Sequence, residues 1–445
     1  MRKRIICSLG VCLLMTGMAF AQTKTNMAWI SGILRHFGNQ DEVLDFSEFE
    51  YLLPPRTDHV VIPGAAGEFN VTFRVEAPNY FRLGRNSLYL SPGDDLQVVI
   101  DFEDPMQSSF MGDGSAANNF LRGIAFSHGG SFINGGFGLR PTAQATVDVI
   151  EEAVAGRKKM LDTLTGVSRE FKRLEYARIR ADAINSYAMA DIYYRFQTKD
   201  KDSLAAFKAT FDSIAAPLVI AYRRNFVDAS LMKLDVYRDI VKDLIQQGGP
   251  EHDIQVIKDW FSASDLVEKM NQVNDKAALA AFRGQITVLG TPAYKNAMDK
   301  TLDELLKFGR GDEAVDFTGV DMEGKPERLS SLKGKLIYVD IWATWCGPCM
   351  AEMPHFEALK AKFKDNPAIA FVSLSVDSDK GVWQKSVRDR QASGFQWQID
   401  WSKLNAYNIV GIPRTLLINK NFKIIDLNGG LPSSPETAAE ILRYL

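Results

Sequence analysis

The feature that most constrains this chain is a pair of cysteines at the junction of an expected strand and an expected helix. An almost unbroken apolar run from Leu336 to Ile341 predicts a strand that is covered on both faces. The segment Trp345-Cys346-Gly347-Pro348-Cys349 follows it and leads into a helical pattern that extends to about Phe363. A thiolate at a helix N-terminus is stabilised by free backbone N–H groups, which can lower its pKa to ~7 or below from about 8.5. The pattern therefore predicts an α/β domain with a reactive dithiol.

The first residues predict secretion. Arg2, Lys3 and Arg4 precede an apolar stretch from Ile5 to Phe20, and Ala19-Phe20-Ala21 supplies small residues for cleavage before Gln22. This is the pattern of a signal peptide over residues 1–21, and it is too short for a stable membrane span. We therefore expect a periplasmic protein without stable membrane insertion after cleavage. A retained anchor is the alternative.

The number of cysteines indicates what the pair does. Cleavage would remove Cys7 and Cys12 and leave Cys346 and Cys349 as the thiols of the mature chain. A bridge between residues so close in sequence constrains the unfolded chain little, so it is better explained by chemistry than by stabilisation. Zinc needs about four ligands, and attached haem needs a histidine where Met350 stands. We expect no metal and no cofactor.

The remaining sequence predicts a multidomain chain. At 445 residues it is long enough for two or three cores, and a net charge of −3 with a pI near 6.1 gives no sign of nucleic-acid binding. Short alternating segments between turn residues predict a β-rich, sandwich-like domain of antiparallel strands over residues 22–118. Helical periodicity predicts an α-helical domain over 119–308, and α/β patterning predicts a third domain over 309–445.

Several stretches of residues 309–445 carry a family resemblance: Ala314-Val315-Asp316-Phe317, Gly334-Lys335-Leu336, Asp340 to Cys349, Glu352-Met353-Pro354 and Tyr407 to Pro413. In these stretches the domain resembles the thioredoxin superfamily, and in particular the TlpA/ResA-like secreted thiol–disulfide oxidoreductases. The segment from Leu88 to Leu96 also resembles the N-terminal extension of some envelope members of that family. The resemblance implies a thioredoxin-like fold and a thiol–disulfide oxidoreductase activity.

Two carboxylates are candidates for proton transfer with the dithiol. We expect Cys346, the outer residue, to be the nucleophile and Cys349 to resolve the mixed disulfide. Asp340 lies in the apolar strand, so burial should raise its pKa. Glu352 lies one turn beyond Cys349 and matches an active-site glutamate of the ResA-like branch. Either could act as the general base, and Glu352 could instead be a solvated helix residue.

The resemblance also implies where a substrate would bind. Pro413 stands at the position of the family's cis-proline, where the backbone of Ile412 would pair with a substrate peptide as a short strand. Trp345 precedes the dithiol, Gly347 and Pro348 stand between its two cysteines, and all three are expected to contact the substrate.

These observations predict a periplasmic thiol–disulfide oxidoreductase that reduces disulfides of envelope proteins and is re-reduced by a membrane-bound donor. A disulfide isomerase is one alternative. A peroxidase is another, although Ala343 and Val339 occupy positions where peroxiredoxin-like enzymes need Thr or Ser and Pro. A third is a scaffold, in which the first two-thirds of the chain hold a partner on which the redox domain acts.

Overall fold

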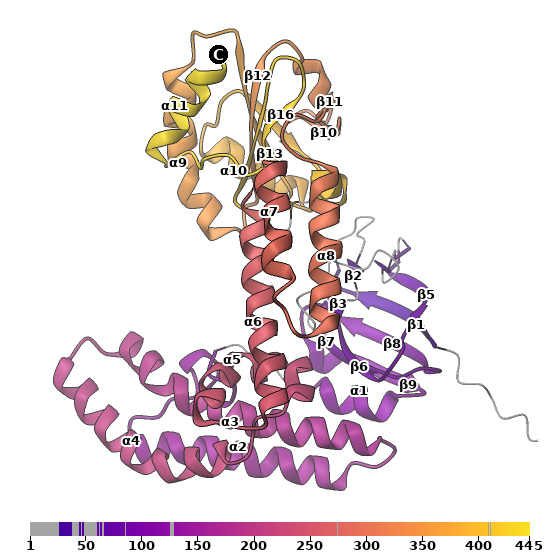
Figure 1. The fold of residues 1–445 in the computed structure, drawn as a ribbon, viewed down its shortest axis with the longest axis vertical. Coiled ribbons are helices and arrows are strands. Elements are labelled where there is room, and N and C mark those ends of the chain that lie inside the picture. The colour runs from indigo at the N-terminus through magenta and orange to yellow at the C-terminus, as the bar shows by residue number, and fades with distance from the viewer. Residues whose placement is uncertain are drawn as a thin grey trace, which may run out of the picture.

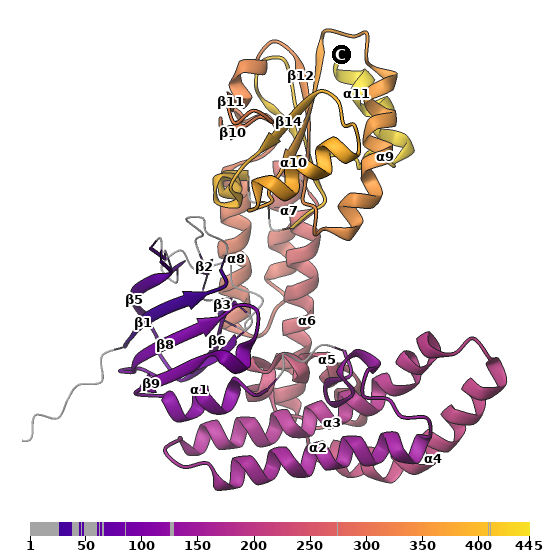
Figure 2. The same ribbon diagram turned by 180° about the vertical axis from the view of Figure 1, so that it is seen from behind.

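The computed structural model describes residues 26–37, 44–45, 47–48, 60–61, 63–64, 66–84, 86–124, 129–273, 275–407, 409 and 411–445. The expected signal peptide lies outside these residues. Small sheets and a base of helices form the lower part of the molecule in Figure 1, and an α/β domain lies at its top. Upright helices lie between the base and that domain, and Figure 2 shows the same arrangement from behind.

The N-terminal region consists of small sheets. Its strands are β1 (Met27–Arg35), β2 (Leu44–Asp45), β3 (Ser47–Glu48), β4 (Val60–Val61), β5 (Glu68–Arg74), β6 (Asn79–Leu83), β7 (Asn86–Leu90), β8 (Asp95–Asp101) and β9 (Ser109–Gly112). The largest sheet has the order β5-β1-β8-β9, beside a sheet β3-β6-β7 and the pair β2-β4. Strands β1 and β8 run parallel, which differs from the antiparallel arrangement that the sequence predicts.

Strand patterning explains the core of this region. Leu96, Val98 and Ile100 alternate along β8 and are buried, and Phe69 and Phe73 do the same along β5. Side chains from β6 and β7 enter the same hydrophobic cluster, so the two larger sheets share one core. Strand β1, which occupies a central position in its sheet, has no counterpart among the strands expected from sequence.

The central region is helical. It contains α2 (Ala143–Thr163), α3 (Arg169–Gln197), α4 (Lys201–Arg223), α5 (Asp235–Leu244), α6 (Glu251–Asn271), α7 (Lys276–Ile286) and α8 (Pro292–Lys307), and it is preceded by the short α1 (Ser115–Leu121). The boundary expected between residues 118 and 119 falls inside α1. Tyr80 and Tyr89 from the sheets belong to the hydrophobic cluster of α3 and α5, so the two regions are packed together.

A buried polar cluster lies at this junction. The hydroxyl of Tyr80 donates to Oε1 of Glu175 at 2.5 Å, and Nε of Arg178 donates to the same oxygen at 3.1 Å. Glu175 is fully buried, and the guanidinium of Arg178 also lies over the ring of Tyr80. A buried carboxylate needs such donors, because its charge has lost the solvation of water.

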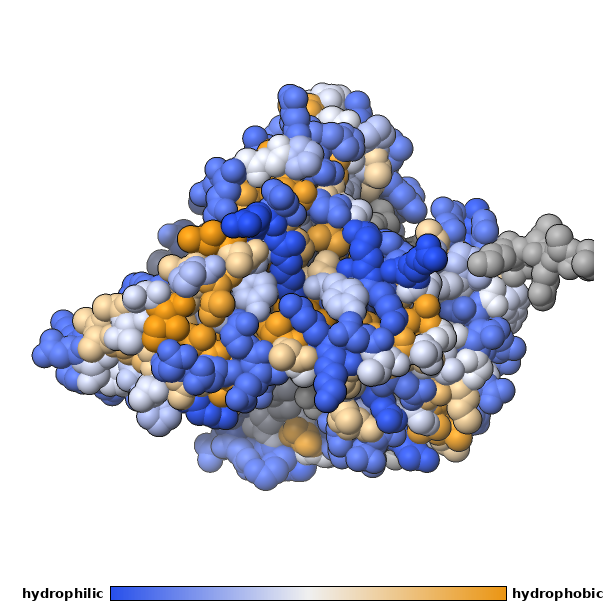
Figure 3. Space-filling view, turned by 90° about the horizontal axis from the view of Figure 1, so that it is seen from below, coloured by the Kyte–Doolittle hydropathy of each residue, from blue (hydrophilic) through white to orange (hydrophobic). Residues whose placement is uncertain are grey.

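Helix α4 has an unusually apolar surface. Among the described residues it is the one helix long and apolar enough to cross a membrane, judged by length and composition alone. Phe207, Phe211 and Ala215 are buried in the helical core, whereas Ile220 is 63% exposed. Apolar residues gather on the part of the base where α4 projects, as the view from below shows (Figure 3). The apolar side chains of α4 are therefore divided between the core and solvent.

The C-terminal domain is built around one mixed sheet. Its order is β11-β10-β14-β13-β12-β15-β16, so the strand that precedes the dithiol has neighbours on both sides. The strands are β10 (Thr318–Val320), β11 (Pro326–Arg328), β12 (Leu336–Trp342), β13 (Ile369–Ser375), β14 (Phe395–Gln398), β15 (Arg414–Ile418) and β16 (Ile424–Asp426). The helices are α9 (Gly347–Lys362), α10 (Lys380–Asp389) and α11 (Pro435–Tyr444).

Every residue of β12 and β13 is buried, which agrees with the apolar runs in the sequence. Leu336 and Tyr338 of β12 pack with Phe356 of α9 and Ile441 of α11. Side chains alternate along a strand, so Asp340 and Trp342 lie on the same face as Tyr338, toward α9.

The upright helices contact the C-terminal domain near the end of β12. Lys276 of α7 forms an ion pair with Asp312 at 2.5 Å, and the ring of Phe308 packs edge-on against Tyr407 at 5.5 Å. A small cavity of about 20 Å³ at this contact is lined by residues of α6 to α8 and by Arg414, which follows Pro413. The helical region thus reaches the part of the domain where β12 ends.

We predict that Tyr80→Phe destabilises the whole protein, because it leaves the buried carboxylate of Glu175 without one of its donors. The free energy of unfolding, measured by urea denaturation, should fall by about 1–3 kcal/mol. Tyr176→Phe is the matched control, since Tyr176 also donates to a carboxylate, that of Asp162, but is exposed. Equal losses for the two variants would contradict this account of the buried cluster.

Candidate active site

The cysteine pair lies where β12 ends and α9 begins. Cys346 and Cys349 form a disulfide with a Cα–Cα distance of 5.2 Å. Cys346 is the N-cap of α9, and its Sγ accepts a hydrogen bond from the backbone N–H of Cys349 at 3.2 Å. Cys346 is 5% exposed and Cys349 is 1% exposed. One N–H group of the first helical turn, that of Cys349, therefore points at the sulfur of the outer cysteine, as expected for a sulfur at a helix N-terminus.

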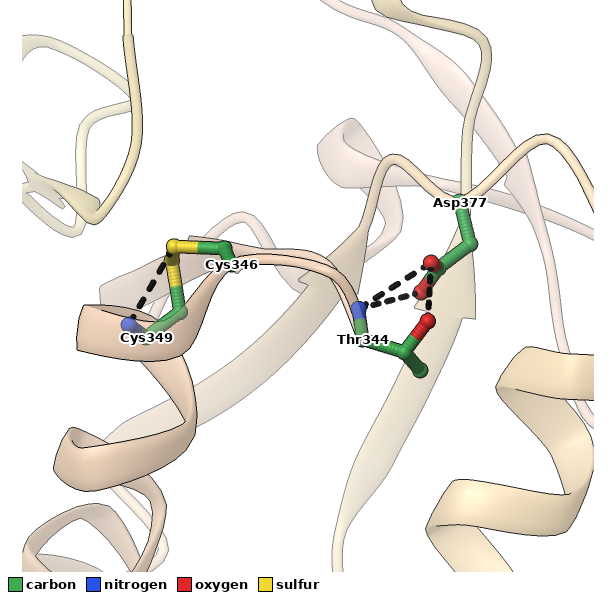
Figure 4. The surroundings of a disulfide bond; sticks show 4 residues. All are labelled: Thr344, Cys346, Cys349 and Asp377. Carbon is green, nitrogen blue, oxygen red and sulfur yellow. Dashed lines mark hydrogen bonds between the residues drawn. A yellow bond between two sulfur atoms is a disulfide. The ribbon is translucent and has the colours of Figure 1, made fainter. Parts of the chain in front are cut away.

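An acid that was not expected from the sequence, Asp377, holds the turn before the dithiol. Asp377 follows β13 and is 3% exposed. Its two carboxylate oxygens accept from the backbone N–H of Thr344 at 3.0 Å, and Oδ1 also accepts from the hydroxyl of Thr344 at 2.6 Å (Figure 4). Ser375 donates to its other oxygen at 2.7 Å. An acid two residues after a buried parallel strand was the signal available in the sequence, because such strand ends meet at one edge of the sheet.

Asp340 lies on β12, the strand that leads to the dithiol, in the middle of the sheet. It is 1% exposed, and its Oδ2 has no hydrogen-bond partner. Burial raises the pKa of Asp340 to about 7, and the nearby charge of Glu352 adds to the rise. The charges of Arg390 and Lys360 act in the opposite direction. A carboxyl group with a pKa near neutrality can both take and give a proton, which suits it to acid–base work.

Glu352 differs from Asp340 in its surroundings. It lies on α9 and is half-buried, and both of its oxygens accept hydrogen bonds from Ser433. The backbone N–H of Ser433 donates at 2.9 Å and its hydroxyl at 2.7 Å. Glu352 therefore connects α9 to the loop before α11, whereas Asp340 keeps an unpaired oxygen. Glu352 is neither fully solvated nor free.

The residues expected to contact a substrate are all at least partly exposed. Trp345 is 67% exposed, and Gly347 and Pro348 are also exposed. The peptide bond between Ile412 and Pro413 is cis, as the resemblance implied, and both residues are half-buried. Strand β15 begins directly after them and pairs with β12, with Arg414 opposite Ile341. The role of these residues in binding stays a prediction.

Within the part of the chain that the structure describes, no three histidine, cysteine, aspartate or glutamate side chains lie close enough to hold a metal ion.

Comparisons with known proteins match the C-terminal domain. A family described as Redoxin matches residues 310–442. The thiol-disulfide oxidoreductase ResA of Halalkalibacterium halodurans is 33% identical over 122 residues, which are 27% of this chain and 68% of that protein. The thioredoxin-like protein YneN of Bacillus subtilis is 30% identical over 127 residues, which are 28% of this chain and 75% of that protein. A crystal structure of a candidate thiol-disulfide oxidoreductase from Bacteroides vulgatus is 37% identical, with a TM-score of 0.30, and covers 31% of this chain and 99% of its own.

We predict that Asp340→Asn stabilises the protein in a pH-dependent way. The pKa of Asp340 is about 7 in the folded protein against an ordinary value of 3.8, so folding favours the protonated acid. The stability that protonation contributes is fully present below about pH 4 and is lost as the pH rises through 7. Urea denaturation measures the free energy of unfolding of both proteins. The advantage of Asp340→Asn over wild type in this free energy should grow by on the order of 3 kcal/mol from pH 4 to pH 8. Asp365→Asn, which changes an exposed acid after α9, should show no such trend.

Proposed function

This chain belongs to the family of ResA-like thiol-disulfide oxidoreductases, and on that premise we propose that it reduces disulfide bonds of envelope proteins in the periplasm. The activity would belong to the C-terminal domain, in which Cys346 and Cys349 form the redox-active pair. The observation that carries the proposal is the position of Cys346 Sγ, which accepts the Cys349 N–H at the start of α9. In the reduced protein the same N–H would stabilise a thiolate on Cys346.

The proposed reaction has two exchange steps. The thiolate of Cys346 attacks one sulfur of a substrate disulfide and releases the other as a thiolate, which leaves a mixed disulfide between enzyme and substrate. The thiol of Cys349 then gives its proton to a base and attacks Cys346 Sγ, which releases the second substrate sulfur. The substrate gains two electrons, and the enzyme ends with the Cys346–Cys349 disulfide.

Asp340 is the better candidate for that base. It is buried, it has an oxygen without a hydrogen-bond partner, and its pKa of about 7 leaves a large share of carboxylate at neutral pH. The two oxygens of Glu352 are engaged by Ser433, so its part would be to raise the pKa of Asp340 through its charge.

The proposed docking edge lies beside the dithiol. An extended substrate would pair with the backbone of Ile412 next to Pro413, while the exposed surface of Trp345, Gly347 and Pro348 would contact residues around its disulfide. This places one short strand of substrate against the end of the sheet where Cys346 lies.

The direction of electron flow and the location belong to the same proposal. The Gly-Pro pair between the cysteines resembles that of reducing thioredoxins, so we propose that a membrane-bound donor re-reduces Cys346 and Cys349. The periplasmic location rests on the signal-peptide pattern of residues 1–21.

We also propose that the sheets and helices before residue 309 help to hold the partner protein. The contact of α6 to α8 with Tyr407 and Arg414 brings this region close to Pro413, and therefore close to the proposed docking edge. A protein substrate bound at Cys346 would then have a second surface available to it.

We predict that Cys349→Ser accumulates mixed disulfides with envelope proteins, because the residue that resolves them is missing. Capture from the periplasm followed by mass spectrometry measures this, and both single cysteine variants should lose insulin-disulfide reduction down to background. Cys346→Ser is the matched control and should capture nothing, since the attacking sulfur is gone. Equal trapping by the two variants would contradict the assigned order.

We further predict a reduction potential for the Cys346–Cys349 pair of about −270 mV, as in thioredoxin. A value of about −120 mV, as in DsbA, would contradict the reducing direction.

We predict that the mature protein begins at Gln22. Mass spectrometry of the N-terminal peptide from the periplasmic fraction checks this, and Ala21→Asp should block cleavage because that position requires a small residue. Recovery of an intact N-terminus from wild-type protein would favour the retained anchor.

A further inference from the structure

A layer of buried polar groups lies between the sheet and the active-site helix. Asp340 pairs in register with Ser373 of β13, and both are 1% exposed. The indole N–H of Trp342 donates to the hydroxyl of Ser373 at 2.8 Å. Because paired residues of parallel strands point to the same face, these three side chains form one polar and aromatic patch under α9.

Helix α10 brings a cation to this patch. Strands β12, β13 and β14 are parallel and follow each other in the sheet. Nζ of Lys360 on α9 donates to the carbonyl of Ser393, which follows α10, at 2.5 Å, so the segment after α10 lies beside α9. Arg390 directly follows α10, and its guanidinium lies 4.4 Å from the centre of the Trp342 ring. The stacking fixes the planar group over the residue that shares a face with Asp340.

The hydrogen bonds of Arg390 leave part of its charge unpaired. Its Nε donates to the backbone carbonyl of Ser386 at 3.1 Å, but its Nη2 is buried and has no hydrogen-bond partner. Asp340 Oδ2 is buried without a partner in the same layer. Leaving either charge alone in the interior would be costly, whereas opposite charges compensate each other at short range even without direct contact.

Other charged groups face Asp340 and Arg390 as well. Glu352 and Lys360 face Asp340 from α9, and Tyr338 lies beside it on the same strand. The ammonium of Lys360 is already bonded to Glu357 at 2.7 Å and to the carbonyl of Ser393 at 2.5 Å. Glu357 and Asp377 face Arg390 in addition to Asp340. Within the described part of this layer, Arg390 is thus the cation whose side chain keeps a buried donor without a hydrogen bond.

We propose that Arg390 is a positioning residue for the thiol–disulfide reaction: its guanidinium favours the carboxylate form of Asp340 and so keeps Asp340 able to accept the proton of Cys349. This inference rests on the proposed function. In the resolving step the proton passes from Cys349 Sγ to Asp340, the Cys349–Cys346 bond forms, and the bond from Cys346 to the substrate breaks. Arg390 touches none of the reacting atoms and acts through the charge of Asp340.

The electrostatics of the site agree with this role. Among the groups that lower the pKa of Asp340, Arg390 has the largest effect, followed by Lys360. Burial and Glu352 hold that pKa near 7, so a further rise would leave little carboxylate at neutral pH.

The first test measures the protonation of Asp340 itself in the full-length oxidised protein. The infrared band of the protonated carboxyl, assigned by its loss in Asp340→Asn, is followed against pH. Arg390→Gln should move its midpoint upward by about one pH unit, while Arg390→Lys should restore most of the wild-type value. Arg388→Gln, on the exposed side of α10, is the matched control and should leave the midpoint unchanged.

If Arg390→Gln does not fold, Arg390→Met takes its place, because it keeps an apolar stem over Trp342 and should give the same shift. An unchanged midpoint would overturn the proposal.

The second test measures the resolving step in single-turnover reduction of a model disulfide. Arg390→Gln should move the acid limb of the pH–rate profile upward by the same amount, which at the acid end is about a tenfold loss of rate. In an Asp340→Asn background the same change should have no further effect on the profile. A loss that persists there would mean that Arg390 acts on structure and not through Asp340, and would overturn the proposal.

Absence of any disulfide exchange by wild-type protein would refute the proposed function. The infrared midpoint would still report on the effect of Arg390 on Asp340.

Discussion

The active site depends on the hydrogen bond from the backbone N–H of Cys349 to Sγ of Cys346. A short turn joins α9 to a strand whose seven residues are all buried, and Cys346 is the N-cap of that helix, so its sulfur lies within reach of this N–H. Asp377 adds to this by holding Thr344, two residues before the first cysteine. The position of the Cys346 sulfur therefore depends on β12, on the neighbouring strand β13 through Asp377, and on α9.

Burial gives the site its acid–base character. A carboxyl group in the centre of a sheet loses the solvation that favours its charge, and Asp340, which lies between β13 and β15, is buried. The charges around it then decide how far its pKa moves, with Glu352 acting in one direction and Arg390 and Lys360 in the other. The same layer contains the stacking of Arg390 on Trp342, so packing and electrostatics are linked there.

The rest of the chain is joined to this domain by packing and by an ion pair. Tyr80 and Tyr89 connect the small sheets to the helices through a shared core, and the buried carboxylate of Glu175 lies at that junction. Helices α6 to α8 then extend to the C-terminal domain, where Lys276 pairs with Asp312 and Phe308 packs on Tyr407. The connection ends near Arg414, so the helical region meets the domain beside Pro413.

The sequence by itself determined the strand–dithiol–helix unit, because an apolar run and a Cys-X-X-Cys pair are local patterns that need no tertiary contact to be recognised. It also predicted the burial of Asp340, since an acid inside such a run has nowhere else to go. It could not predict β1 as a central strand with one parallel neighbour, because strand pairing joins residues far apart in the chain. For the same reason only the tertiary structure decided that Asp377 holds Thr344, that Ser433 engages Glu352, and that Arg390 shares a face with Asp340. Each of these contacts joins residues at least 33 positions apart, and no periodicity encodes a contact between separate elements.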